Sequence, residues 1–292
     1  MINSPSLRSS LPSSQLPSFH ELDPRDACRI TSNAEIEPQQ PRHTALASPT
    51  GLQVEQLSAA YRSVQALQDI SFDLPSGQLI GIFGPNGAGK STLIKAMLGL
   101  IPGASGQANT NNRPLTDQLE RVAYVPQRSQ IDWTFPASVW DVVLMGRVKK
   151  AGLFSRLSVV SRRIAAAALE RVGMSDYRDR RIGDLSGGQQ QRVFLARSLA
   201  QEADLFFLDE PFVGVDQTTE DVLFRIFREL AAEGKTVVVV NHDLGESIIN
   251  FDQLILLNRQ LIAAGPREDV LTPDHMTRAY GNHVRFFVGD AV

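Results

Sequence analysis

A glycine-rich segment carries the clearest chemical signal in the sequence. Its residues are Gly84, Pro85, Asn86, Gly87, Ala88, Gly89, Lys90, Ser91 and Thr92. They fit the pattern G-x-x-x-x-G-K-[ST], after an apolar run and before a helical pattern. In such a loop, backbone N–H groups turn toward phosphate oxygens, and the helix N-terminus adds partial positive charge. The segment predicts a phosphate-binding loop, in which Lys90 contacts the β- and γ-phosphates and the Ser91 hydroxyl binds Mg²⁺.

Two carboxylates follow another apolar run, residues 205–208. Asp209 is placed to hold the Mg²⁺ shell, and Glu210, one residue further, can polarise an attacking water. An Asp-Glu pair after a strand is by itself more often a capped turn. The phosphate-binding loop upstream favours the catalytic interpretation.

A second glycine segment also precedes a helical pattern. It consists of Leu185, Ser186, Gly187, Gly188 and Gln189. Ser186 is typical of a helix N-cap, and the paired glycines expose backbone N–H groups that form a second anion site. One nucleotide needs only one phosphate-binding loop, so the second site suggests that two chains close over each ATP.

Together these motifs resemble the ATP-binding-cassette (ABC) ATPases, whose signature motif is similar to residues 185–189. The resemblance covers about residues 52–268. It implies ATP hydrolysis with ATP and Mg²⁺ as cofactors, and a P-loop core of the RecA-like type. The chain differs from the family pattern in two minor ways: Asn241 precedes His242, and residues 212–214 read Phe-Val-Gly. Neither difference removes a catalytic group.

The resemblance implies roles for four further residues. Tyr61 lies where an aromatic ring stacks on adenine, and Gln127 lies where a glutamine contacts Mg²⁺ or the attacking water and reports to a membrane partner. Asp216 falls in the loop that crosses the dimer interface. His242 matches the histidine that contacts the γ-phosphate.

The pattern of apolar residues predicts an α/β fold. Apolar runs at residues 79–83, 122–125, 205–208, 237–240 and 254–257 suit strands that are covered on both faces, and helical patterns lie between them. We expect a parallel sheet, an inserted helical subdomain at about residues 137–190, a hairpin at residues 254–262 and a small antiparallel β part. The helical pattern after the phosphate-binding loop includes Leu93, Met97 and Leu100.

Composition separates the two ends of the chain from its middle. Residues 1–50 hold 9 Ser and 7 Pro, which predicts a mostly disordered tail. The ABC domain is expected over residues 51–268, and a C-terminal extension over 269–292. The net charge of −3 gives no sign of nucleic-acid binding, and the single Cys28 excludes a disulfide framework. No apolar run approaches the ~18 residues of a membrane-spanning helix, so we expect a soluble, intracellular protein.

A finer resemblance concerns the cargo. Residues 124–127, 131–136 and 141–147 look like the ATPase subunits of manganese, zinc and iron importers. This implies integral-membrane permease subunits, an extracytoplasmic solute-binding protein acting through the complex, a homodimer of this chain, and a cytoplasmic location on the inner face of the plasma membrane. The five histidines are scattered, so we expect the cargo metal to bind elsewhere in the complex.

Other functions stay open. Siderophore, haem and cobalamin importers share parts of the same pattern, and neighbouring permease genes would distinguish them. A soluble regulatory ABC ATPase would not co-purify with a membrane protein. A P-loop kinase is disfavoured by residues 185–189, because a kinase has no use for a second phosphate site.

The composition of the tail generates a first prediction. A chain that starts near Ser48 should keep its ATPase activity and melting temperature, because the removed segment has too few apolar residues to join a core. Calorimetric melting and an ATPase assay of both chains check this. A substantial loss of melting temperature would show that the tail docks.

Overall fold

The computed structural model describes residues 51–62, 64–151, 157–242 and 244–281, all within the compact unit Leu46–Val292. The tail expected over residues 1–50 and the last part of the C-terminal extension, residues 282–292, lie outside the described residues.

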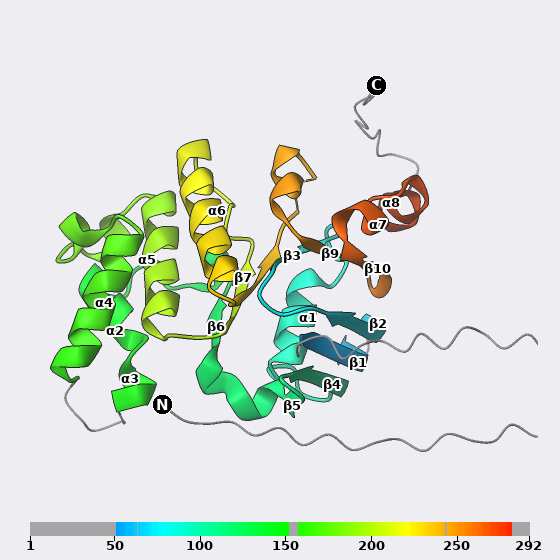
Figure 1. Cartoon of the computed structure of the whole chain (residues 1–292), viewed down its shortest axis with the longest axis horizontal. Coiled ribbons are helices and arrows are strands. Elements are labelled where there is room, and N and C mark those ends of the chain that lie inside the picture. Colours follow the sequence, from blue (N-terminus) through cyan, green and yellow to red (C-terminus); the bar gives the residue numbers. More distant parts are fainter. Residues whose placement is uncertain (1–50, 63, 152–156, 243, 282–292) are drawn as a thin grey trace, which may run out of the picture. The chain divides into compact units, whose positions relative to one another are not determined.

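The larger of two sheets has six strands in the order β10-β9-β3-β8-β7-β6 (Figure 1). Its strands are β3 (Leu79–Phe83), β6 (Val122–Val125), β7 (Leu205–Asp209), β8 (Thr236–Val240), β9 (Gln253–Asn258) and β10 (Gln260–Pro266). Neighbours from β9 to β6 run parallel, and β10 pairs antiparallel with β9. The α/β prediction is confirmed, and the expected hairpin is formed by β9 and β10.

Apolar side chains on both faces hold this sheet in the interior. In β3, Leu79 and Phe83 join one apolar cluster, whereas Ile80 and Ile82 join the other. Successive side chains of a strand point to opposite faces, so a continuous apolar run serves both clusters. This explains why the strands of the sheet appear in the sequence as unbroken apolar runs.

The smaller sheet is antiparallel, in the order β2-β1-β4-β5. Its strands are β1 (Leu52–Tyr61), β2 (Val64–Leu74), β4 (Ser105–Thr110) and β5 (Arg113–Pro114). Helix α1 (Lys90–Met97) shares an apolar cluster with Leu67 of β2 and Ile82 of β3, so it packs against both sheets.

One expected helical position is wrong. Leu100 does not continue α1, and its side chain is 56% exposed. The helix ends because Gly99 adopts a φ of +69°, the left-handed conformation that commonly terminates helices. The amide of Leu100 then donates to the carbonyl oxygen of Lys95 at 2.8 Å, which closes the last turn.

Helices occupy the chain between β6 and β7. They are α2 (Val139–Met145), α3 (Val148–Ala151), α4 (Val159–Arg171) and α5 (Gly187–Ala200), drawn in green shades in Figure 1. In the described part of this stretch, the only strand-like pairing is an isolated bridge between Ser138 and Arg181. Short 3₁₀ helices lie at Leu115–Arg121, Arg128–Gln130, Ser175–Tyr177, Ile182–Asp184 and Glu246–Asn250.

In the described part of the chain after β7 there are three α-helices. They are α6 (Gln217–Ala232), α7 (Arg267–Val270) and α8 (Pro273–Tyr280). Val270, Met276 and Ala279 are almost completely buried, so α7 and α8 belong to the core of the domain. Among the described residues, no helix combines the length and apolar character that a membrane span requires.

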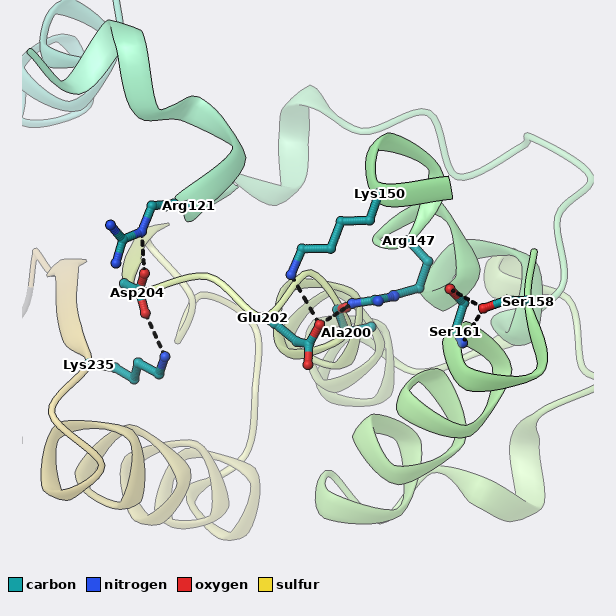
Figure 2. Close-up of polar contacts among 9 residues, drawn as sticks. All are labelled: Arg121, Arg147, Lys150, Ser158, Ser161, Ala200, Glu202, Asp204 and Lys235. Carbon is teal, nitrogen blue, oxygen red and sulfur yellow. Dashed lines mark hydrogen bonds and ion pairs between the residues drawn. The ribbon is translucent and has the colours of Figure 1, made fainter. Parts of the chain in front are cut away.

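Two carboxylates fix the connection between α5 and β7 (Figure 2). Glu202 accepts from Arg147 Nη1 at 2.5 Å and from Lys150 Nζ at 3.0 Å. Asp204 accepts from Arg121 Nε and Lys235 Nζ, both at 2.6 Å. The bonds from Arg147 and Lys150 hold the pKa of Glu202 below its usual range. The connection is therefore tied both to the helical region and to the ends of neighbouring strands.

The contrast between the two cations of Glu202 generates a prediction. The Arg147 side chain is 6% exposed and also donates to the Ala200 carbonyl at 2.8 Å, whereas Lys150 is 41% exposed. Replacing Arg147 with Met should lower the free energy of unfolding by about 1–3 kcal/mol, because the buried contact with the Ala200 carbonyl and the part-buried contact with Glu202 lose their charged donor. Lys150→Met, the matched control, should cost less than about 1 kcal/mol. Urea unfolding measures the free energy of unfolding of both variants. Equal losses would contradict the conclusion that Arg147 contributes more than Lys150.

Candidate nucleotide site

The residues of the site meet at the carboxyl edge of the large sheet. Val240, the last residue of β8, is in register with Ile82 of β3 on one side and with Asp209 of β7 on the other. The residues that follow these strands therefore lie close together. This places the phosphate-binding loop, Glu210 and His242 at one edge, as expected for ligand sites of open α/β sheets.

Glycine is required where the phosphate-binding loop enters α1. Gly89 is the N-cap and has a φ of +96°, and a Cβ atom there would lie 2.8 Å from the carbonyl oxygen of Ala66. The loop is also held from outside, because the Arg259 amide in the β9–β10 turn donates to the Ala88 carbonyl at 2.8 Å. The backbone of the loop is thus fixed around the N-terminus of α1.

Lys90 is buried within this loop. Its Nζ donates to the carbonyl oxygens of Gly84 at 2.8 Å and Pro85 at 3.1 Å. Burial lowers the pKa of Lys90, while the nearby charges of Glu210 and Asp209 act in the opposite direction. The ammonium group is thus fixed against the backbone of the loop.

Ser91 and Asp209 form the part of the site that suits a divalent cation. Ser91 Oγ donates to Asp209 Oδ1 at 2.8 Å, and Asp209 Oδ2 is buried without a hydrogen-bond partner among the described residues. Burial raises the pKa of Asp209, and repulsion from Glu210 adds to the increase. A hydroxyl, a carboxylate and an unpartnered oxygen fit Mg²⁺, whose other ligands come from water and phosphate. No described group of three or more His, Cys, Asp or Glu residues could hold a metal by itself.

Glu210 and Gln127 are in direct contact. Gln127 Nε2 donates to Glu210 Oε2, and Gln127 Oε1 accepts from Ser129 Oγ at 3.2 Å. Glu210 has a φ of +54°, which its amide supports by donating to the Val240 carbonyl at 3.2 Å. The turn after β7 therefore directs this carboxylate to the residue that follows β6.

A cleft of about 550 Å³ opens beside the phosphate-binding loop. Four of the predicted site residues line it: Asn86, Gln127, Glu210 and His242. Phe212, Val213 and Gly214 line the cleft as well, between Glu210 and α6. The structure thus brings the residues after β3, β6, β7 and β8 around one cavity.

Other predicted residues lie outside this lining. Tyr61 ends β1 and is 49% exposed. Ser186 is the N-cap of α5 and forms a capping box with Gln189, so Gly187 and Gly188 begin the helix. Asp216 is the N-cap of α6 and accepts from the Thr219 amide at 2.7 Å, which lowers its pKa.

Sequence reasoning did not identify two tyrosines near the site. Tyr124 shares a sheet face with Phe207 and Asp209, and burial, with the neighbouring Asp209 carboxylate, raises the pKa of its hydroxyl. Tyr124 stands three residues before Gln127, in a strand whose side chains point alternately to the two faces of the sheet. That position could have identified it from the sequence. The Tyr280 hydroxyl, at the end of α8, lies near the Gly84 amide, and burial raises its pKa to about 12. No sequence signal links Tyr280 to Gly84.

Comparisons with known proteins identify the family of the chain. Residues 67–213 match the family described as ABC transporter. The manganese transport system ATP-binding protein MntB of Bacillus subtilis (strain 168) is 50% identical over 235 residues, which cover 80% of this chain and 94% of that protein. The zinc transport system ATP-binding protein TroB of Treponema pallidum (strain Nichols) is 48% identical, covering 82% and 90%.

A solved structure extends the comparison to the fold. An inward-facing ABC transporter of proposed metal-chelate type superposes with a TM-score of 0.70 at 28% identity, covering 79% of this chain and 89% of that chain. The family match spans half of the sequence, and both relatives exceed 45% identity over most of their length. The chain therefore belongs to the ABC transporter family and is one of its nucleotide-binding ATPases.

Proposed function

We propose that the chain is the ATP-hydrolysing subunit of an importer for divalent metal ions, with manganese as the first candidate and zinc or iron next. The observation that supports this most is the identity of about half of all aligned residues with a manganese transport protein, over 94% of its length. The zinc relative follows closely at 48% identity. Residues 124–147, whose pattern suggested this group, lie in the aligned part of the domain.

We assign the chemistry of one site to residues around the cleft. Residues 84–92 hold the phosphates, and Lys90 meets the β- and γ-phosphate charge. Ser91 and Asp209 hold Mg²⁺, with Gln127 beside them; when bound, the ion neutralises phosphate charge. Glu210 orients and polarises the attacking water, and its bond to Gln127 fixes the carboxylate. His242, which also lines the cleft, stabilises the γ-phosphate as its charge redistributes.

We infer that a second copy of the chain completes each site. The N-terminus of α5 carries the glycines and N–H groups of an anion site, but residues 186–188 do not line the cleft around the phosphate-binding loop. In a head-to-tail homodimer, Ser186, Gly187, Gly188 and Gln189 of one chain would contact the ATP held by its partner. Asp216 would then lie near the boundary between the two chains, and Tyr61 would stack on adenine.

The remaining partners follow from the proposed transport role. The two relatives are ATP-binding proteins of transport systems, so we propose that this chain docks on integral-membrane permease subunits and works with an extracytoplasmic solute-binding protein. The docked subunit would lie in the cytoplasm, on the inner face of the plasma membrane. Closure of the dimer on ATP would reach the permease through the segment around Gln127.

A second candidate is the ATPase of a siderophore, haem or cobalamin importer. The structural relative of proposed metal-chelate type favours it. Its 28% identity is well below the values for the manganese and zinc proteins, so metal ions come first. A regulatory ATPase that acts without a permease is tested by co-purification with membrane proteins.

The assignment of Glu210 generates a prediction. Replacing Glu210 with Gln should lower ATP turnover by about 100-fold or more, the usual contribution of a general base, while ATP binding persists because Lys90, Ser91 and Asp209 are unchanged. Gel filtration with ATP should show a dimer. Glu170→Gln, an exposed change on α4, is the matched control and should leave turnover intact. Turnover of the Glu210 variant within a few-fold of the parent would remove Glu210 from its proposed role.

The proposal that the cargo is manganese generates a further prediction. Disrupting the gene should lower cellular manganese most among the transition metals, as measured by elemental analysis of washed cells. Calorimetry of the isolated protein with Mn²⁺ should show no tight site without nucleotide, because no described group of three or more His, Cys, Asp or Glu residues forms a metal site. With nucleotide, Mn²⁺ should replace Mg²⁺ at Ser91 and Asp209.

The rival cargo gives a different result in the same strain. Unchanged manganese, zinc and iron, together with lost uptake of siderophore, haem or cobalamin, would overturn the metal-ion assignment. A complementing copy that carries Glu210→Gln provides the control, since it restores the protein without its hydrolysis.

A further inference from the structure

Arg128 joins the segment after Gln127 to the first turn of α5. Its Nε and Nη2 atoms donate to Gln190 Oε1 at 3.1 and 2.9 Å. Gln190 is only 3% exposed, so this contact is largely shielded from water. Gln127, the neighbour of Arg128 in the chain, bonds to Glu210. Two adjacent residues therefore contact the proposed general base and α5.

Both ends of the Arg128–Gln190 contact are held by further bonds. Gln190 Nε2 donates to the Ile182 carbonyl at 3.1 Å. Trp133 Nε1 donates to the Arg128 carbonyl at 3.1 Å, and the guanidinium lies 5.5 Å from the centre of the Trp133 ring. Trp133 in turn packs edge-on against Phe194 of α5 at 5.4 Å between ring centres. Arg128 and Trp133 thus both contact α5.

The guanidinium also lies directly beside the proposed anion site. A Cβ atom placed on Gly187 would be 3.3 Å from Arg128 Nη1 and 3.0 Å from the carbonyl oxygen of Gly214. A cation at a helix N-terminus opposes the helix dipole, and it becomes favourable when an anion binds there. The placement of Arg128 therefore suits a first turn that receives a phosphate.

We propose that Arg128 is a positioning residue that makes the phosphate site of residues 186–188 move together with Gln127 and Glu210. The proposal rests on the proposed function, because it requires this site to close on ATP held by a second copy of the chain. Closing the dimer would then set the hydrolytic residues of one site and the anion site of the other in a single movement. A shift of the segment around Gln127 would displace the hydrolytic residues and the anion site together.

A simple brace between the helical region and the core would predict something different. Arg171 of α4 is such a brace, since it donates to Glu229 of α6 at 3.2 Å and to Glu233, the C-cap of α6, at 2.8 Å. Among the described residues, its hydrogen bonds and ion pairs reach neither the Gln127 segment nor the first turn of α5. Arg171→Met therefore removes a guanidinium that links the same two regions, and it serves as the matched control.

The first test needs no nucleotide and no dimer. In the full chain, Arg128→Met should speed amide hydrogen exchange at residues 189–191, the first hydrogen-bonded amides of α5, by about tenfold or more, the effect of losing a hydrogen bond from a charged group. Arg171→Met should leave exchange at these residues unchanged, and Arg128→Lys should restore part of the protection. Equal exchange in the Arg128→Met variant and the parent would overturn the proposal.

The second test measures closure. In a Glu210→Gln background, ultracentrifugation with ATP should show dimers that dissociate at about tenfold higher protein concentration once Arg128→Met is added. ATP binding to the monomer should stay at the parent level, because that ATP uses residues 84–92 of its own chain. Gln190→Met should cost less when it is added to Arg128→Met than when it is added to the parent, because only the bond to the Ile182 carbonyl is then left to lose.

The outcomes separate this proposal from the proposed function. Unimpaired dimers with Arg128→Met, or an equal loss with Arg171→Met, would overturn the role of Arg128 while leaving the dimer intact. If the Glu210→Gln parent stays monomeric with ATP, the homodimer itself is overturned. The exchange measurement then decides alone whether Arg128 holds the first turn of α5.

Discussion

The hydrogen bond between Ser91 and Asp209 is the contact on which the site depends. It joins the start of α1 to the end of β7, two elements that are far apart in sequence. Asp209 is only 1% exposed, so its carboxylate is removed from water at a considerable desolvation cost. The cost is acceptable because β7 lies between β6 and β8, where backbone pairing fixes the strand on both sides. Glu210, one residue beyond the sheet, can then turn toward Gln127.

Much of this arrangement could be predicted from the sequence. The unbroken apolar runs revealed the buried strands, and Gly84 to Thr92 revealed the loop, because those signals are local and their physical causes are local. The end of α1 was misjudged, since Leu100 kept the helical spacing while Gly99 ended the helix. The contacts of Gln127 with Glu210 and of Tyr280 with Gly84 depend on how distant segments pack. No spacing along the chain encodes them.

The two edges of the large sheet perform different tasks. At the carboxyl edge, charged groups are left with incomplete partners among the described residues: Asp209 Oδ2 has no hydrogen-bond partner there, and the hydrogen bonds of Lys90 go to backbone carbonyls of its own loop. At the opposite edge, Asp204 is fully engaged by Arg121 and Lys235. Complete pairing rigidifies, whereas incomplete pairing leaves capacity to bind a ligand. The fold thus places its binding capacity at one edge and its anchoring contacts at the other.

The order of strands also governs how the chain can fold during its synthesis. Strand β3 ends at Phe83, yet its neighbours are β8, which begins at Thr236, and β9, which begins at Gln253. While the ribosome makes the intervening residues, the strand that carries the nucleotide loop has neither of its partners. Apolar side chains that later fill two core clusters are exposed during that interval, when aggregation is the main hazard. A nascent chain of this protein therefore acquires its central sheet, and with it a usable nucleotide loop, only after β8 and β9 have been made.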